Sequence, residues 1–292
     1  MILVVGSGFL GSYVLKTFSE LTDEKLAGTF HTQRTQPNIQ RVEWIKLDVA
    51  DSDDIARLAD KLKGEKLTVF YFAAVHNIDY IYTHPDEARQ INVTALQNFL
   101  DSVKNIDKLF FASTDCVYGE NINGELLTES SELNPVNIYG IQKHEAEMIV
   151  TSHGFTCVRL PFMLGPSLTN KPHFYDTIIK SLSEGKSVEM IDGMVRSVLG
   201  YSQTAKLLYE LSLLPKEKLP SVINIAGDEH LTKYEIGLKL AAKIGARQSL
   251  VKKISEEEGR KFFRDARASS AAMDNTLLKQ LLKKEKIIWE ER

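Results

Sequence analysis

The chain alternates between two hydrophobic patterns, and these predict strands and helices in turn. Between several short apolar runs, apolar residues recur every three or four positions, as in helices with one buried face. Two such stripes are Leu10, Val14, Phe18 and Leu21, and Ile91, Ala95, Phe99 and Val103. The short runs are rich in β-branched and aromatic residues, which is typical of strands covered on both faces. They span residues 2–5, 25–30, 43–47, 67–74, 108–113 and 155–161. This alternation predicts an α/β fold with a doubly wound parallel sheet.

The alternation loosens after residue 164. Gly165-Pro166 begins a stretch where we expect mainly loops and helices, punctuated by one strand near 222–227 that joins the sheet. Thr232 and Glu235 have the spacing of a capping box, so a helix should begin there. The sequence therefore predicts a dinucleotide-binding domain over 1–164 and, over 165–292, mostly a smaller, interleaved substrate-binding lobe.

Composition and charge narrow the classes of partner. The 292 residues are 43% hydrophobic and 26% charged, with a net charge of −3, as in ordinary globular proteins. The mixed charges of 252–267 predict a solvated face rather than a nucleic-acid interface. Two cysteines without metal-ligand spacing predict neither a disulfide framework nor a metal site, which fits a cytoplasmic protein. The first apolar run stops at Gly6, so we expect no signal peptide and no membrane span.

A glycine-rich loop, GSGFLG, follows the first predicted strand. Gly6, Gly8 and Gly11 have GxGxxG spacing, and a helix is predicted directly afterwards. Glycines let the backbone approach a pyrophosphate, which then lies at the positive end of that helix. The position predicts a Rossmann-type dinucleotide site, with Phe9 and Leu10 in the same loop.

The second predicted strand ends in TFHTQR (29–34), which contains no acid. An acid at this point usually binds the ribose 2′-hydroxyl of NAD, whereas a basic group accommodates the 2′-phosphate of NADP. Thr32 and Arg34 therefore favour NADP over NAD, although Arg34 is equally compatible with a solvent-facing loop. Asp48, after the third strand, has two interpretations: it accepts a hydrogen bond from the adenine amino group, or it caps the helix that begins near Ser52.

Two further motifs carry candidate chemistry. In YGIQK, Tyr139 and Lys143 are one helical turn apart, so their side chains share a face. An ammonium group beside a phenol lowers its pKa and makes proton exchange easier. Upstream, STDCVYG (113–119) follows the apolar run LFFA and places a hydroxyl, a carboxylate and a thiol at a strand end.

Together these residues resemble the extended short-chain dehydrogenase/reductases, the NAD-dependent epimerase/dehydratase superfamily, which act largely on nucleotide sugars. The resemblance covers nearly the whole chain and includes LDV (47–49), FAA (72–74), Asn92 and RLPFMLGP (159–166). It implies that Thr114 holds the reacting oxygen, Tyr139 exchanges a proton with it, and Lys143 assists Tyr139 and holds the nicotinamide ribose. It also implies cofactor contacts from Val49, Ala73, Ala74 and Pro161.

Within this family the chain most resembles the dTDP-4-dehydrorhamnose reductases. The resemblance implies NADPH-dependent reduction of the 4-keto group of a nucleotide-linked deoxysugar, an oxidoreductase step of carbohydrate biosynthesis. Cys116 stands where sugar-nucleotide dehydratases carry a glutamate, which disfavours dehydration. Position suggests substrate contacts from His76, Asn77, Asp115, Asn170 and Arg196, and a surface or structural role is an equal alternative for most of them.

Two other functions remain open. Cys116 and His173 match the proton-exchanging pair of a bifunctional epimerase-reductase that resembles GDP-fucose synthase, or they serve as packing and loop residues. Alternatively, the chain resembles the NADP-binding regulatory subunit of methionine adenosyltransferase, which is not itself a reductase. The sequence leaves the sugar, the nucleotide and the oligomeric state undetermined, and a homodimer stays open.

Overall fold

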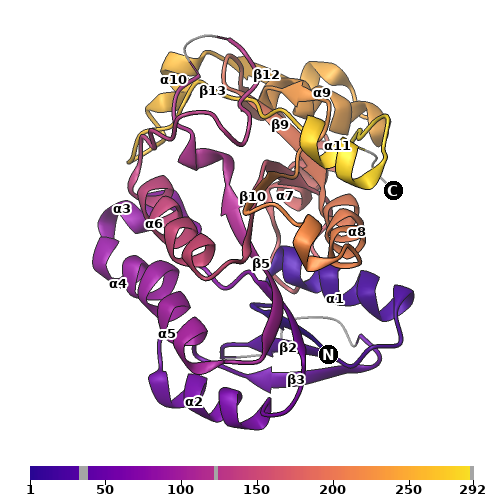
Figure 1. The fold of residues 1–292 in the computed structure, drawn as a ribbon. Helices are drawn as coiled ribbons and strands as arrows, with labels where there is room; N and C mark the ends of the chain where they lie inside the picture. Colours follow the sequence, from indigo (N-terminus) through magenta and orange to yellow (C-terminus); the bar gives the residue numbers. More distant parts are fainter. Residues whose placement is uncertain (33–38, 122–123, 290–292) are drawn as a thin grey trace.

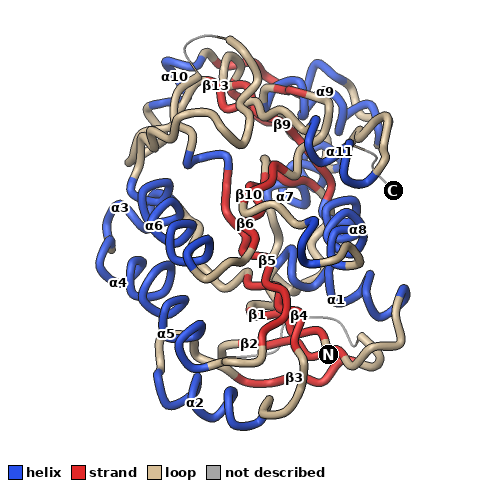
Figure 2. The backbone as a smooth tube through the Cα atoms, viewed as in Figure 1, coloured by secondary structure: helices blue, strands red, loops and turns tan. Residues whose placement is uncertain are grey.

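A seven-stranded parallel sheet forms the centre of the computed structural model, which describes residues 1–32, 39–121 and 124–289 (Figures 1 and 2). The strand order is β10-β6-β5-β4-β1-β2-β3, with every pairing parallel. This confirms the predicted doubly wound α/β fold. The strands are β1 (Ile2–Val5), β2 (Leu26–Phe30), β3 (Val42–Lys46), β4 (Leu67–Tyr71), β5 (Ile106–Thr114), β6 (Thr156–Leu160) and β10 (Val222–Asn224).

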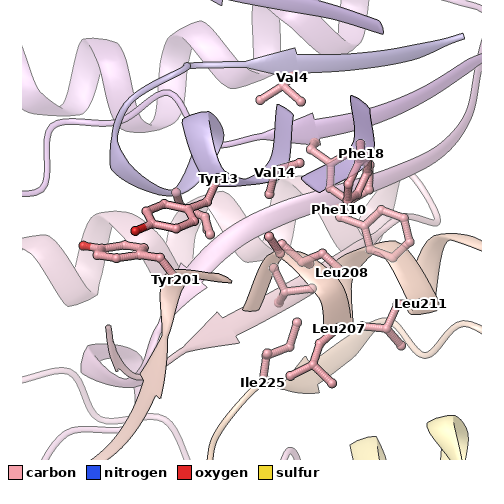
Figure 3. Packing of buried hydrophobic residues seen from close by; sticks show 14 of the residues in the cluster. Val4, Tyr13, Val14, Phe18, Phe110, Tyr201, Leu207, Leu208, Leu211 and Ile225 are labelled. Atoms are coloured by element: carbon pink, nitrogen blue, oxygen red, sulfur yellow. The ribbon is translucent and has the colours of Figure 1, made fainter. Parts of the chain in front are cut away.

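Each strand buries alternate side chains against helices on opposite faces of the sheet. Ile2 and Val4 of β1 belong to one apolar cluster, whereas Leu3 and Val5 belong to the other. On the first face, Figure 3 shows side chains of α1 packed toward leucines of α8. The helices on that face are α1 (Phe9–Leu21), α8 (Tyr201–Ser212) and α11 (Thr276–Leu282). The other face carries α2 (Ser52–Lys61), α5 (Ala95–Ser102) and α6 (Ile138–Ser152).

The two predicted helical stripes differ from the structure in detail. Leu10, Val14 and Phe18 are buried as expected, but Leu21, in the last turn of α1, is 48% exposed. The second stripe is interrupted because a π-helical turn, Gln90–Thr94, joins α4 (Pro85–Arg89) to α5. Its extra residue rotates the buried face. Asn92 is therefore 2% exposed, while Ile91 is only half-buried.

The C-terminal region contains more strands than the sequence predicts. A second sheet is formed by β7 (Phe162–Leu164), β9 (Val195–Gly200), β11 (His230–Leu231) and β13 (Ser270–Ala271), and β8 (Val188–Ile191) pairs with β12 (Val251–Ile254). Besides α8 and α11, the helices of the C-terminal region are α7 (Phe174–Ser183), α9 (Lys233–Lys243) and α10 (Glu256–Arg260). The region consists mainly of loops and helices, as expected, but the expectation of a single further strand is wrong, because runs of two to six residues are too short to show a periodic pattern.

Three local predictions about this region have clear outcomes. The capping box is confirmed: the Thr232 hydroxyl accepts a hydrogen bond from Glu235 N at 3.2 Å, and the Glu235 carboxylate accepts one from Thr232 N at 2.8 Å. The expected strand near 222–227 is β10, which pairs with β6. The stretch 252–267 is only partly a solvated face, because it contains β12, α10 and a loop that contacts Asp79 and Ile138. None of the described helices is long and apolar enough to cross a membrane.

Candidate functional site

The glycine loop joins β1 to α1, and the path of its backbone requires glycine at two positions. Gly6 has a φ of +93°, and a Cβ there would lie 2.5 Å from Ala73 N. A Cβ on Gly11 would lie 2.2 Å from the Gly6 carbonyl oxygen. Gly8 is different, because a Cβ there would meet no described atom within 4 Å beyond those of the adjoining chain, and no side chain caps α1. The open space beside uncapped amides fits a pyrophosphate.

The end of β2 lies beside Asp48. The Asp48 carboxylate is 3.2 Å from His31 Nε2 and accepts a hydrogen bond from Ala50 N at 2.9 Å. The interpretation of Asp48 as a helix cap is wrong, since Asp51 caps α2 by accepting bonds from Asp53 N and Asp54 N. Thr32 is exposed next to this pair, whereas Arg34 lies outside the described residues. Val49 follows Asp48 and is half-buried.

The segment that follows β4 passes directly over the glycine loop. Ala73 abuts Gly6, and Ala74 leads on toward His76. Asn92 from the π-helical turn fixes this segment, because its side chain accepts from Val75 N at 2.8 Å and donates to Val75 O at 3.0 Å. Asn92 also donates to Gln142, the neighbour of Lys143, at 3.0 Å. This clamp connects the segment after β4 with α6.

Thr114 ends β5, and Tyr139 stands in the first turn of α6. A close approach between the two elements requires Gly140, where a Cβ would lie 2.5 Å from the Cys116 carbonyl oxygen. The Thr114 hydroxyl donates to the Asp115 carboxylate at 2.9 Å and accepts from Cys116 N at 3.2 Å. Tyr139 is close enough that Asp115, Cys116 and Thr114 all influence its pKa. The structure thus brings Thr114 and Tyr139 together.

Lys143 is buried with only 2% of its surface exposed. Its ammonium lies 4.1 Å from the centre of the Phe111 ring. The nearby Glu147 is bound by Arg159 through two hydrogen bonds of 2.9 and 2.7 Å, so among the described residues Lys143 has no direct ion-pair partner. Burial lowers the pKa of Lys143 to about 8. A buried cation without an ion-pair partner is typical of a binding site.

The sequence predicts that Lys143 lowers the pKa of Tyr139, and the structure has the opposite net shift. Burial raises the Tyr139 pKa above its usual value, and Cys116 and Asp115 raise it further, while Thr114 acts to lower it. Desolvation outweighs the hydrogen bond from Thr114, which lowers the pKa, because the phenolate would be enclosed by protein. Tyr139 is therefore a neutral phenol, which suits a proton donor.

Cys116 and His173 occupy different surroundings. Burial, followed by the negative charge of Asp115, raises the pKa of the Cys116 thiol to about 12. His173 precedes α7, and its ring centre lies 4.5 Å from that of Phe9 in the glycine loop. Its Nε2 is 3.3 Å from the Tyr201 hydroxyl. Burial and the charge of His76 lower the pKa of His173.

The candidate substrate residues have different surroundings. The His76 side chain keeps an exposed surface, yet the protein around its ring lowers its pKa, and the charge of Lys143 lowers this pKa further. Asn77 caps α3 (Ile78–Thr83), because its side-chain oxygen accepts a hydrogen bond from Tyr80 N at 3.0 Å. Asn170 is exposed in the loop before α7. Pro161 is buried directly after β6, while the Leu10 side chain belongs to the core.

Arg196 of β9 lies beside Asp115, which directly follows β5. Its Nε lies 3.6 Å from the Asp115 carboxylate, and its other nitrogens donate to the carbonyl oxygens of Val195 and Ala268 at 2.7 and 2.5 Å. Burial raises the pKa of Asp115, although the charge of Arg196 opposes this shift. These contacts hold the guanidinium beside Asp115.

Sequence reasoning missed several charged residues near Arg196. The Lys233 ammonium lies between 5.7 and 5.9 Å from three phenylalanine rings, and burial followed by the charges of Arg196 and Arg267 lowers its pKa. Arg267 pairs with Asp79 at 3.0 Å. These residues lie far apart in the sequence and share no motif, so no local signal identifies them. The three rings near the Lys233 ammonium are those of Phe162, Phe174 and Phe263.

Comparisons with known proteins identify the family. Residues 2–207 match the NAD dependent epimerase/dehydratase family, and the chain belongs to it. One relative is methionine adenosyltransferase 2 subunit beta from Xenopus tropicalis, 25% identical over 263 residues, covering 87% of this chain and 75% of the relative. Another is a putative UDP-glucose 4-epimerase from Methanocaldococcus jannaschii, 31% identical over 153 residues, about half of each chain.

Solved structures with the same fold include several enzymes of nucleotide sugars. A dTDP-glucose 4,6-dehydratase from Streptomyces venezuelae, determined with NAD bound, has a TM-score of 0.80 at 19% identity and covers 98% of this chain and 92% of its own. A hypothetical dTDP-4-dehydrorhamnose reductase from Sulfolobus tokodaii also has a TM-score of 0.80, at 23% identity, with 98% and 96% covered. At these identities the likeness shows the fold.

Proposed function

We propose that this protein is an NADPH-dependent reductase of the 4-keto group of a nucleotide-linked sugar. The observation that carries the proposal is the buried Lys143, which has no ion-pair partner among the described residues and lies one helical turn from Tyr139; Tyr139 in turn lies close to Thr114. Removing a lysine from water without a counter-charge costs folding free energy, so a functional reason is expected. Hydroxyl groups of a ribose would provide the missing partners.

The described residues fit a dinucleotide. The open space at Gly8 and the uncapped start of α1 suit a pyrophosphate, and Lys143 suits the adjoining ribose. When bound, the reduced nicotinamide supplies the hydride for a ketone carbon. Tyr139, as a neutral phenol, donates its proton to the oxygen that becomes the alcohol, while Thr114 holds that oxygen by a hydrogen bond. One hydride and one proton convert the ketone to the alcohol.

The preference for NADPH is supported by the acid-free end of β2. Thr32 is exposed there, and the neighbouring His31 adds no negative charge beside Asp48. We expect the protein to bind NADPH more tightly than NADH. Arg34→Ala should weaken NADPH binding selectively, because a 2′-phosphate needs a cation. Fluorescence titration measures both affinities, with Arg57→Ala on α2 as the control; equal affinities that Arg34→Ala leaves unchanged would contradict the assignment.

The central test is NADPH oxidation with a panel of nucleotide-linked 4-keto sugars. We expect Tyr139→Phe to lower kcat by on the order of 10² or more with nearly unchanged NADPH affinity, since only the proton donor is lost. Tyr82→Phe, an exposed tyrosine of α3, is the matched control. A fully active Tyr139→Phe variant would rule out the mechanism.

Two alternatives have different outcomes in the same assay. The raised pKa of Cys116 disfavours the thiolate that an epimerase-reductase needs. Deuterium incorporation beside the ketone in D₂O would nevertheless favour that activity. A subunit role without turnover is favoured by the similarity to methionine adenosyltransferase 2 subunit beta over 87% of the chain. Tight NADPH binding without reduction of any substrate in the panel would support it.

A further inference from the structure

The first turn of α6, which carries Tyr139, takes part of its hydrogen bonding from the distant loop 264–267. The Asp265 carboxylate accepts a hydrogen bond from Ile138 N at 3.2 Å. Asn137, the N-cap of α6, accepts from Gly140 N at 2.8 Å and also donates to the Ala266 carbonyl oxygen at 3.0 Å. More than 120 residues separate the partners of these contacts between the loop and α6. The C-terminal lobe therefore helps to define where α6 begins.

The same loop is also anchored to α3, the helix next to α6. Asp79 accepts hydrogen bonds from Arg264 N at 2.9 Å and from the Arg267 guanidinium at 3.0 Å. Arg267 in turn donates to the Asp265 carbonyl oxygen at 2.8 Å, which fixes the shape of the loop. Because α3 and α6 lie side by side (Figure 1), loop 264–267 bridges both helices.

We propose that Asp265 is a positioning residue for Tyr139, on the premise of the reductase function proposed above. A carboxylate at the start of a helix satisfies a free amide and interacts favourably with the helix dipole. Ile138 immediately precedes Tyr139, so this contact restricts the backbone from which the phenol projects toward Thr114. Asp265 touches none of the reacting groups assigned above and acts through Ile138.

The proposal predicts a specific pattern of variants. Asp265→Ala should lower kcat roughly tenfold, since small misplacements of a reacting group are costly, and should leave NADPH affinity unchanged. Asp265→Asn keeps an acceptor oxygen and should restore most of kcat. Asp274→Ala is the matched control: Asp274 lies in the same region and accepts from Thr276 N at 2.8 Å, at the start of α11. Its loss should affect stability without lowering kcat.

Hydrogen exchange of the Ile138 amide, resolved by NMR, tests the contact without any assay of turnover. We expect faster exchange in Asp265→Ala than in the wild type and in Asp274→Ala, measured on the intact chain. Unchanged exchange in Asp265→Ala would overturn the proposal, as would an unchanged kcat or an equal loss of kcat in Asp274→Ala. A wild type that reduces no substrate would refute the reductase function separately, and the exchange experiment would still decide whether Asp265 orders the start of α6.

Discussion

Burial of Lys143 costs folding free energy, and the proposed role of this lysine explains why it is nevertheless buried. Its charged form is stabilised in water but is enclosed by protein in the folded chain, where the ammonium lies over the Phe111 ring. Burial therefore lowers its pKa from the usual 10.5 to about 8. A shift of this size corresponds to a penalty on the order of 3 kcal/mol for keeping the lysine charged.

Replacing the Lys143 ammonium with an uncharged side chain should change the stability of the protein. Lys143→Met removes the buried charge and should raise the free energy of unfolding at pH 7 by on the order of 2 kcal/mol, while abolishing reduction. Between pH 8 and 10.5 the unfolded chain holds more protons at this lysine than the folded chain, so wild-type stability should rise with pH relative to the variant. Denaturant unfolding at several pH values measures this difference.

Lys252→Met, at an exposed position of β12, is the control for removing a positive charge. It should change stability little, and its difference from the wild type should not narrow between pH 8 and 10. A Lys143→Met variant less stable than the wild type would show that the ammonium has a stabilising partner in the folded chain.

At the scale of elements, glycines determine how α1 and α6 meet the sheet. Gly11 and Gly140 stand where a Cβ would press on a carbonyl oxygen, whereas Gly8 faces open space and has an ordinary φ of −70°. Packing therefore requires glycine at positions 11 and 140. At Gly8, the proposed requirement comes from the ligand.

This contrast gives a prediction for two single substitutions in one loop. Gly8→Ala should leave the melting temperature nearly unchanged but weaken NADPH binding roughly tenfold or more, because the methyl group occupies the space proposed for the pyrophosphate. Gly11→Ala should destabilise the protein itself, since its Cβ would lie 2.2 Å from Gly6 O. Thermal melts and NADPH titrations separate the two effects. Wild-type affinity in Gly8→Ala would refute the proposed site.

The elements also show which features a sequence can predict. The strands of the main sheet and the glycine loop follow from local patterns, because a buried parallel strand is continuously apolar and a tight turn needs glycine. The π-helical turn was missed because one added residue shifts the helical period without changing composition. The small strands of the C-terminal region, such as β11 with two residues, are too short to carry a pattern.

In the candidate site, too, the sequence predicts what depends on local spacing and not what depends on tertiary structure. Tyr139 and Lys143 share one helix, so their spacing suffices to predict that they share a face. The direction of the Tyr139 pKa shift was wrong because burial depends on surrounding tertiary structure, which the motif does not contain. Asp79 and Arg267 meet although 188 residues separate them, and no spacing rule predicts such a pair.

Across the whole molecule, the two predicted regions share one core. The face of the sheet that packs on α1 is completed by α8 and β10, both from beyond residue 164 (Figure 3). Asn224 of β10 accepts a hydrogen bond from the buried Tyr118 hydroxyl at 2.6 Å and donates to Leu127 O at 2.9 Å. Region 1–164 therefore depends on the C-terminal region for apolar and polar contacts.

The last prediction follows from this shared core: a fragment of residues 1–164 should not fold cooperatively alone. Loss of α8 removes Leu207, Leu208 and Leu211 from the core and exposes Val14 and Phe18 of α1. Burial of a large apolar side chain contributes roughly 1.5–3 kcal/mol, so the combined loss rivals the total stability of a typical domain. Thermal melts followed by circular dichroism, with NADPH titrations, measure the outcome.

Adding the missing region as a separate chain distinguishes loss of packing from damage caused by cutting the chain. Co-expression of 1–164 with 165–292 should restore a cooperative melt and NADPH binding, because β10 can still pair with β6 and α8 can still cover α1. If 1–164 alone melts cooperatively and binds NADPH like the intact chain, the first region is autonomous, and the contacts of α8 and β10 contribute little to its stability.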